Sequence, residues 1–281
     1  MPTIFRSVAL IPAALVLAVA MHAPFALAAE PPTVPAAEIP AGWEPAWSDE
    51  FSVDGMPDPA KWDYEVGRLR NNEAQYYTRA RRENVRVENG ELVIEARKEA
   101  FEGAEYTSAS LVTLGKMQWT SGRFEVRAQL PKGRGMWPAI WLLGSSCPTA
   151  GWPRCGEIDI MEFVGHAPGI IHGTVHTEAY NHIKHNQKGA TVTLDDPHGT
   201  WHVYALEWRA KDLRWLIDGR EYFRYDDDGS GVASWPFAEP EYLILNIAVG
   251  GAWGGQKGID ETIFPQRMRI DYVRVFKRIS D

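Results

Sequence analysis

The 281-residue sequence has little helical periodicity, only two cysteines and no block of basic residues. Because apolar residues rarely recur at 3.6-residue spacing, a helical bundle or an α/β fold is not expected. Charges of both signs are scattered along the chain, and the formal net charge is -8. A phosphate backbone is bound by clustered Lys and Arg, which this chain lacks. We therefore expect no nucleic acid as a partner.

Long hydrophobic runs are also missing, except at the N-terminus. There Arg6 precedes an apolar run over residues 8–21, and small residues follow up to Ala28. This order predicts a signal peptide over residues 1–28, and the run is too short for a membrane span. Residues 29–41 are rich in Pro and Ala and should form a flexible leader. The sequence thus predicts a secreted or periplasmic monomer that is not membrane-bound, with one folded domain over residues 42–281.

Cys147 and Cys155 are the two cysteines. In an exported protein, a pair so close in sequence can form a disulfide, and the C-x7-C spacing matches no familiar metal site. The sequence leaves open whether the bond forms. By contrast, the chain has 12 Trp, whose flat amphipathic rings suit both core packing and stacking on sugars.

Short stretches of alternating apolar and polar residues recur between Gly, Pro, Asn and Asp, which predicts an all-β chain. Two tight hairpins are expected, one over residues 85–97 turning at Asn89 and Gly90, and one turning at Asp218 and Gly219. The number and spacing of strands favour a jelly-roll sandwich of two antiparallel sheets with a concave cleft. Further strands are expected over residues 108–115, 122–130, 136–143, 157–163, 169–176, 201–208, 242–249 and 267–277.

One predicted strand carries three acids in the sequence GEIDIMEF. Strict alternation places Glu157 and Asp159 on one face and leaves Glu162 on the other. Glu162 joins them only if Ile160 or Met161 is absorbed in a β-bulge. The plain alternative is three solvated acids, but acids are poor strand formers and like charges on one face repel, so this pattern favours a function.

The spacing of the two glutamates suits a retaining glycosidase. With one residue bulged out, their Cα atoms lie about 13 Å apart, and side chains leaning together can reach the roughly 5–5.5 Å that this mechanism needs. Between them, Asp159 cannot ionise independently and can share a proton with Glu157. Its field should also raise the pKa of Glu162, which keeps that acid ready to protonate a leaving group.

The motif EIDIME, preceded by GWPRC and GMWPAIWLLG, resembles glycoside hydrolase family 16, and most closely its bacterial laminarinase branch. The resemblance runs from WSDEF at residues 47–51 to FPQRMRIDYVRVF at residues 264–276. It implies a jelly roll with a glycan cleft, Glu157 as nucleophile, Glu162 as acid/base, and endo-hydrolysis of β-1,3-glucan. The bulged motif is shared with agarases and carrageenases and differs from that of lichenases.

The same resemblance implies further site residues. Trp137 and Trp141 would line the cleft, although their spacing alone is more typical of core, and His176 would lie near the acid/base. Asn71, Asn72 and Trp253 fall in segments that resemble substrate-contacting loops. A structural calcium ion would be held at Glu50, Gly90 and Asp271, of which Asp271 alone offers a side chain. No cofactor is implied for catalysis.

Two residues depart from the family pattern, Ser110 where Arg is frequent and Ala252 where Asn is frequent. Subsite affinity or linkage preference can differ as a result. Three alternatives stay open: mixed-linkage 1,3-1,4-glucan, an agar or carrageenan, and a non-catalytic β-glucan-binding protein. A sulfated galactan would need clustered Lys and Arg, which the cleft segments lack. Hydrolysis and transglycosylation are not distinguished.

Overall fold

The computed structural model describes Met1 and residues 38–279. The expected signal peptide lies outside these described residues, apart from Met1, as does most of the leader. At the end of the leader, the Glu38 carboxylate accepts a hydrogen bond from Arg274, and the Pro40 carbonyl accepts one from the Trp43 amide at 3.1 Å. This short part of the leader is therefore in contact with the folded domain.

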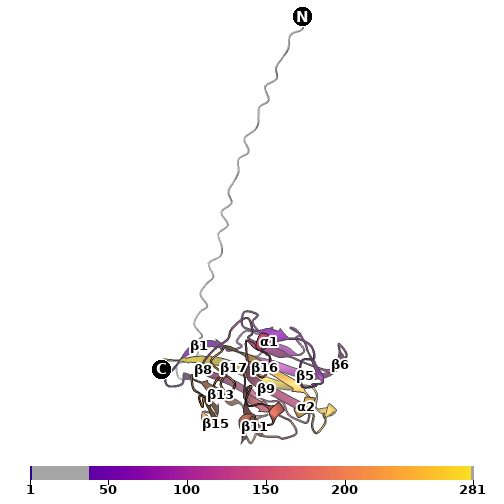
Figure 1. Cartoon of the computed structure of the whole chain (residues 1–281). Coiled ribbons are helices and arrows are strands. Elements are labelled where there is room, and N and C mark those ends of the chain that lie inside the picture. Colours follow the sequence, from indigo (N-terminus) through magenta and orange to yellow (C-terminus); the bar gives the residue numbers. More distant parts are fainter. Residues whose placement is uncertain (2–37, 280–281) are drawn as a thin grey trace. The chain divides into compact units, whose positions relative to one another are not determined.

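The described chain is built from strands, as the sequence predicts, and they form two sheets (Figure 1). The first, ten-stranded sheet contains, in spatial order, β15 (Arg220–Asp226), β14 (Asp212–Ile217), β13 (His202–Trp208), β8 (Gly122–Gln129), β17 (Gln266–Arg278), β5 (Glu91–Phe101), β6 (Ala104–Ser108) and β3 (Gln75–Tyr77), with β1 (Trp43–Asp49) paired to β17 and β4 (Val85–Glu88) paired to β5. The second, seven-stranded sheet contains β12 (Lys188–Thr193), β11 (Ile170–His176), β10 (Glu157–Phe163), β9 (Met136–Gly144), β16 (Glu241–Val249), β7 (Ser110–Val112) and β2 (Asp63–Glu65). Between the strands lie four short helices, α1 (Cys147–Ala150), α2 (Gly251–Gly254) and the 3-10 helices η2 (His182–Lys184) and η3 (Glu261–Ile263).

The larger of two clusters of buried apolar side chains forms the core that joins the inner faces of the two sheets, and the smaller, which includes Trp141, lies on the other face of the seven-stranded sheet. Phe124 and Trp208 contribute from the ten-stranded sheet, and Ile158 and Leu243 contribute from the seven-stranded sheet. Since alternate residues of each strand point into this core, the opposite face of the seven-stranded sheet is left for polar and aromatic side chains. The core thereby determines which side chains of β10 face outward.

Both predicted hairpins are confirmed. Asn89 and Gly90 have φ angles of 56° and 77°, and Asp218 and Gly219 have φ angles of 50° and 78°. Two successive residues with positive φ are what a two-residue turn needs to match the twist of its strands, which is why Asn-Gly and Asp-Gly recur there.

The sequence analysis missed several strands. Four of them are β1, β2, β3 and β12, which are short, interrupted by Pro45 or exposed at an edge. The expected strand over residues 108–115 is wrong as a single element, because the chain passes from β6 to β7, and so from one sheet to the other, around Ala109. Alternation alone does not show such a crossing. No helix within residues 38–279 is long and apolar enough to cross a membrane.

Candidate active site

Strand β10 contains the bulge that would bring Glu162 to the same side as Glu157 and Asp159. Asp159 pairs with Trp141 of β9, but Met161 pairs with the next residue, Ile140, so Ile160 is the extra residue. The register with β11 shifts over the same stretch. Ile160 and Met161 are both buried in the core, and Glu162 is turned to the same side as Glu157 and Asp159.

Trp215 supports this bulge from the opposite sheet. Its indole Nε1 donates a 2.7 Å hydrogen bond to the main-chain carbonyl of Asp159. A bulge disrupts the strand ladder, and a buried carbonyl without a donor is costly. Trp215 supplies a donor at this position, a role that nothing in the local sequence around either residue indicated.

The three acids line a cleft of about 590 Å³ on the outward face of the seven-stranded sheet. Most of the predicted site residues come together here, whereas Asn72 is exposed and does not line the cleft. The predicted residues that line it are Asn71, Trp137, Trp141, Glu157, Asp159, Glu162, His176 and Trp253.

Glu157 is held by Trp152, whose Nε1 donates to the carboxylate at 3.0 Å. Trp152 belongs to a loop closed by the disulfide between Cys147 and Cys155, which the sequence had left open. Burial, and then the charge of Glu162, raise the pKa of Glu157 to about 8, while Trp152 and Arg70 act in the opposite direction.

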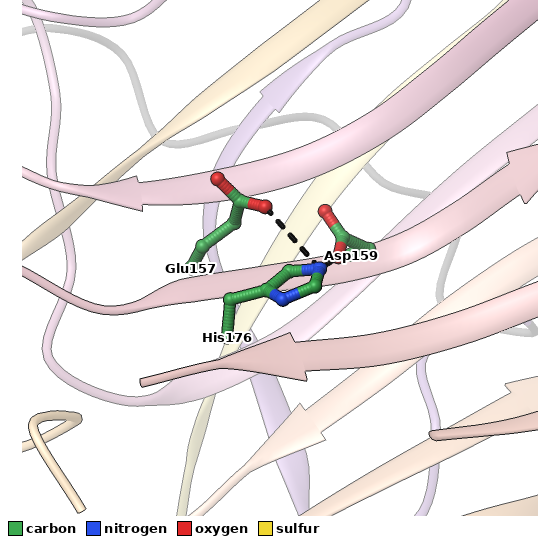
Figure 2. A group of neighbouring side chains, drawn as sticks. All are labelled: Glu157, Asp159 and His176. Atoms are coloured by element: carbon green, nitrogen blue, oxygen red, sulfur yellow. Dashed lines mark ion pairs between the residues drawn. The ribbon is translucent and has the colours of Figure 1, made fainter. Parts of the chain in front are cut away.

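Asp159 and His176 form the floor of the site beside Glu157. Figure 2 shows the His176 ring on the neighbouring strand directed at both carboxylates, with Nε2 at 3.5 Å from Asp159 and 3.7 Å from Glu157. Burial lowers the pKa of His176 to about 4, so the ring is neutral at neutral pH. Burial and the neighbouring carboxylates raise the pKa of Asp159 well above its ordinary value. Asp159 therefore resists ionisation while its neighbours are charged, in line with the expectation that it cannot ionise independently.

The expected position of His176 needs correction. It pairs with Glu157 across the strands, and His172 is the residue that pairs with Glu162. The family resemblance therefore placed the wrong histidine beside Glu162. One potential metal-ligand atom each from Glu157, Asp159 and His176 lies within 4.8 Å of the other two, a spacing that could hold a metal ion.

Glu162 receives a 2.9 Å hydrogen bond from Nε1 of Trp137. Burial raises the pKa of Glu162 to about 7, and the carboxylate that adds to this shift is Glu73. Asp159 and Glu162 also influence each other, and that interaction raises the pKa of Asp159. Trp137 also packs edge-on against Trp253, with ring centroids 5.4 Å apart.

Comparison with known proteins agrees with this geometry. The family model for glycosyl hydrolases family 16 matches residues 72–274. A beta-glucanase of Rhodothermus marinus is 54% identical over 247 residues, which cover 85% of this chain and 86% of that protein. The chain belongs to glycoside hydrolase family 16.

Solved structures of this family have the same fold. The laminarinase from Rhodothermus marinus superposes with a TM-score of 0.83 at 52% identity, over 85% of this chain and 98% of that one. SCLam, a non-specific endo-beta-1,3(4)-glucanase, superposes with a TM-score of 0.81 at 49% identity, over 85% of this chain and 93% of that one. The protein is therefore a jelly-roll glycoside hydrolase of the laminarinase type.

In this glycoside hydrolase, the residues expected to hold calcium fit an ion poorly. The Glu50 carboxylate accepts hydrogen bonds from Arg274 at 2.9 and 2.8 Å, and Asp271 accepts one from Arg127 at 2.6 Å. Both acids line a pocket of about 380 Å³ that Gly90 does not reach. A calcium ion bound by the Asp271 carboxylate would have to displace the Arg127 guanidinium group, so we derive no role for calcium from this arrangement.

Several residues that shape the family 16 site were missed by the sequence analysis. They are Arg70, Glu73, Trp152, His172, Trp215 and Asn246. Trp152 had a usable signal, because it lies five residues before the nucleophile in a loop bounded by the two cysteines. The others come from segments far away in the sequence, and only the fold brings them to the cleft.

Proposed function

We propose that this glycoside hydrolase cleaves β-1,3-glucan inside the chain and retains the β anomeric configuration. The observation that carries the proposal is that Glu157 and Glu162 line one cleft across a β-bulge, each with an indole N–H on its carboxyl group. Two carboxyl groups that flank one glycosidic bond are the machinery of glycoside hydrolysis. The beta-glucanase and laminarinase relatives support β-1,3-glucan as the substrate.

In the first step, ionised Glu157 attacks the anomeric carbon while protonated Glu162 donates its proton to the departing glycosidic oxygen. The C–O bond to the leaving chain breaks, and a glycosyl ester forms on Glu157. Glu157 and Glu162 titrate as a pair with pKa values of about 8 and 7, so the pair holds one proton between these pH values, and donation uses the form in which that proton is on Glu162. Arg70 contributes by lowering the pKa of Glu157, which favours the ionised nucleophile.

In the second step, Glu162, now ionised, takes a proton from water, and the water oxygen attacks the anomeric carbon. The ester bond to Glu157 breaks and the nucleophile is released as a carboxylate. The protonated Asp159 lies on the same strand face and can stabilise that carboxylate as it forms. His176, neutral and buried, packs against both acids and limits their movement.

A mixed-linkage 1,3-1,4-glucan is a second candidate substrate. It is favoured by the likeness to SCLam, described as a non-specific endo-beta-1,3(4)-glucanase. Carrageenan is less suitable, because the described cleft offers four acids and one arginine, which disfavours sulfated chains. In a glucan-binding protein without catalysis, the free-energy cost of desolvating three clustered acids would have no compensating function.

We also propose that the protein acts outside the cytoplasm, as a monomer. Export is supported by the charge and hydropathy pattern of residues 1–28 and by the Cys147–Cys155 disulfide, since such bonds persist in oxidising compartments. The polysaccharide substrate supports it too, because polymers of this size do not enter cells.

The proposal is tested with laminarin, lichenan, agarose and carrageenan, with the products sized over time. We expect laminarin to be cut into mixed oligosaccharides from the start, and Glu157→Ser to release almost nothing. Proton NMR of the first product should show the β anomer. An α anomer would exclude the retaining roles of Glu157 and Glu162, and binding without product would favour the non-catalytic alternative.

A further inference from the structure

Arg70 occupies an unexpected position in the cleft. It precedes β3 on a loop, yet its side chain lines the cleft together with Glu157 and Trp141. The centre of its guanidinium group lies 4.8 Å from the centre of the Trp141 ring, a cation–π distance. A cation thus covers a tryptophan that was expected to stack on sugar.

The Trp141 ring is fixed by a chain of hydrogen bonds. Its Nε1 donates to Asn246 at 2.8 Å, Asn246 donates to the Tyr77 hydroxyl at 3.0 Å, and that hydroxyl donates to Glu73 at 3.3 Å. Only 7% of Trp141 is exposed. The ring therefore cannot turn to offer another face, and a sugar on this side meets the guanidinium group instead.

Arg70 is itself held in place. Its guanidinium group donates to Glu65, and Glu65 accepts a second hydrogen bond from the Ser110 hydroxyl at 2.7 Å. Among the described residues, Glu65 is the hydrogen-bond partner of Arg70, and a guanidinium group has five N–H donors in a rigid fork. Donors remain for a ligand in the cleft.

The loop that carries Arg70 is constrained on its other side. Asn71 and Asn72 both have positive φ, at 54° and 53°, a conformation that non-glycine residues adopt when the surroundings require it. The Asn71 carbonyl accepts a 2.8 Å hydrogen bond from the Ala252 amide in α2. Because loop and side chain are already ordered, a ligand would lose little entropy in using them.

We propose that Arg70 is a specificity-determining residue that donates hydrogen bonds to sugar hydroxyl groups beside Glu157, in place of stacking on Trp141. Its ligand is a neutral sugar unit, because Glu65 already compensates its charge and the carboxyls of Glu73 and Glu157 lie close by. The inference rests on the proposed glucan hydrolysis and deepens it. It predicts that substrate affinity near the nucleophile depends on a polar donor.

The test compares Arg70→Leu with Arg79→Leu. Arg79 is a matched control, because it too pairs with an acid, Asp63, and lies over an aromatic ring, Tyr64, but it is outside the cleft. With laminari-oligosaccharides, Arg70→Leu should raise KM about tenfold, as for losing a charge-assisted hydrogen bond, and should also lower kcat, because Arg70 favours the ionised form of Glu157. Arg79→Leu should leave both constants within about twofold of the parent.

Binding is measured independently of turnover, by calorimetry of oligosaccharides on Glu157→Ser with and without Arg70→Leu. Leucine still covers the Trp141 ring, so an unchanged affinity would mean that Arg70 only packs and would overturn the proposal. If Arg70→Leu does not fold, Arg70→Met decides, because methionine is long and flexible but also lacks N–H donors. A parent-like KM in Arg70→Met would likewise overturn the proposal.

The two hypotheses fail in different ways. If the unmodified protein releases no sugar from any glucan, the proposed function fails. If it is active and the KM of Arg70→Leu equals that of Arg79→Leu, only the role of Arg70 fails.

Discussion

Each catalytic carboxyl group of this family 16 enzyme accepts a hydrogen bond from one tryptophan indole. Trp152 donates to Glu157 and Trp137 donates to Glu162. An N–H donor favours the ionised form of a carboxyl group, whereas burial favours the protonated form. Burial prevails for both, because both pKa values are raised. The acids thus keep a proton between them near neutral pH, as a nucleophile and acid pair requires.

The first prediction concerns the basic limb of the pH profile. Glu157 and Glu162 titrate as a pair with pKa values of about 8 and about 7, and the active form holds one proton, on Glu162, so kcat/KM should fall as the pH rises through about 8. Trp137→Phe removes the indole donor that lowers the pKa of Glu162, and should therefore move the basic limb to higher pH. The measurement is the pH dependence of kcat/KM for both proteins. A limb that moves to lower pH would contradict the assignment of Glu162.

A second prediction concerns Glu241 at the start of β16. It is 1% exposed, and neither carboxyl oxygen has a hydrogen-bond partner among the described residues. Burial, and then the charge of Glu157, raise its pKa well above the ordinary value. A raised folded-state pKa means that stability is complete below the unfolded-state value and falls as the pH rises above it.

The amide side chain of Glu241→Gln cannot lose a proton, so this variant should not show the loss of stability that ionisation of Glu241 causes as the pH rises. We expect its melting temperature to match the parent at pH 4 and to exceed it by a widening margin towards pH 8. The exposed Glu239→Gln is the control and should follow the parent. A constant difference between Glu241→Gln and the parent at every pH would show that the carboxyl group is not the cause.

At the scale of secondary structure, the bulge in β10 is the decisive element. It depends on support from both sides, because Ile160 and Met161 enter the core while Trp215 of β14 donates to the Asp159 carbonyl. The catalytic geometry therefore depends on a residue of the opposite sheet. Such support holds functional side chains in place more firmly than a loop does.

Trp215→Phe tests this dependence. Losing a buried hydrogen bond should cost about 1–3 kcal/mol of stability, and the loosened bulge should lower kcat about tenfold or more. Trp208→Phe is a matched control, since its Nε1 also donates to a buried carbonyl, that of Phe237, at 3.1 Å. For Trp208→Phe we expect a similar decrease in the free energy of unfolding, measured with urea, but a kcat close to that of the parent. Equal kcat in the two variants would refute the role of Trp215.

At the scale of the whole molecule, the ten-stranded sheet forms the support and the seven-stranded sheet carries the cleft. The arginines of the ten-stranded sheet neutralise its acids in pairs, including Arg127 with Asp271 and Arg274 with Glu50. The pair with Arg127 occupies Asp271, the one side chain expected to bind a structural calcium ion. The sheet is expected to be stable without that ion.

The final prediction follows for metal removal. Dialysis against EDTA should leave the melting temperature unchanged within about 1 °C, and millimolar calcium should not raise it, because a ligand that binds only the folded state always stabilises it. Differential scanning calorimetry measures both. A calcium-dependent rise in melting temperature that Asp271→Asn abolishes would establish the calcium site instead.

Much of the fold and of the candidate site could be predicted from the sequence. Alternation and turn residues predicted the strands and both hairpins, because period-2 patterning and positive φ at Asn-Gly and Asp-Gly are local properties. The three acids were found because they break a local rule of strand composition. Even the bulge could be deduced, since one residue must be absorbed for Glu162 to face the cleft.

Only the tertiary structure determined the partners of those acids. Which histidine lies beside Glu157, which tryptophan supports Asp159 and which cation covers Trp141 all depend on contacts between strands far apart in the chain. A strand's own sequence specifies which side chains share a face, but it carries no information on register with neighbours or on loops that fold over it. The candidate catalytic acids could therefore be identified from local sequence, whereas their pKa values and the specificity of the site depend on contacts within the packed sheets.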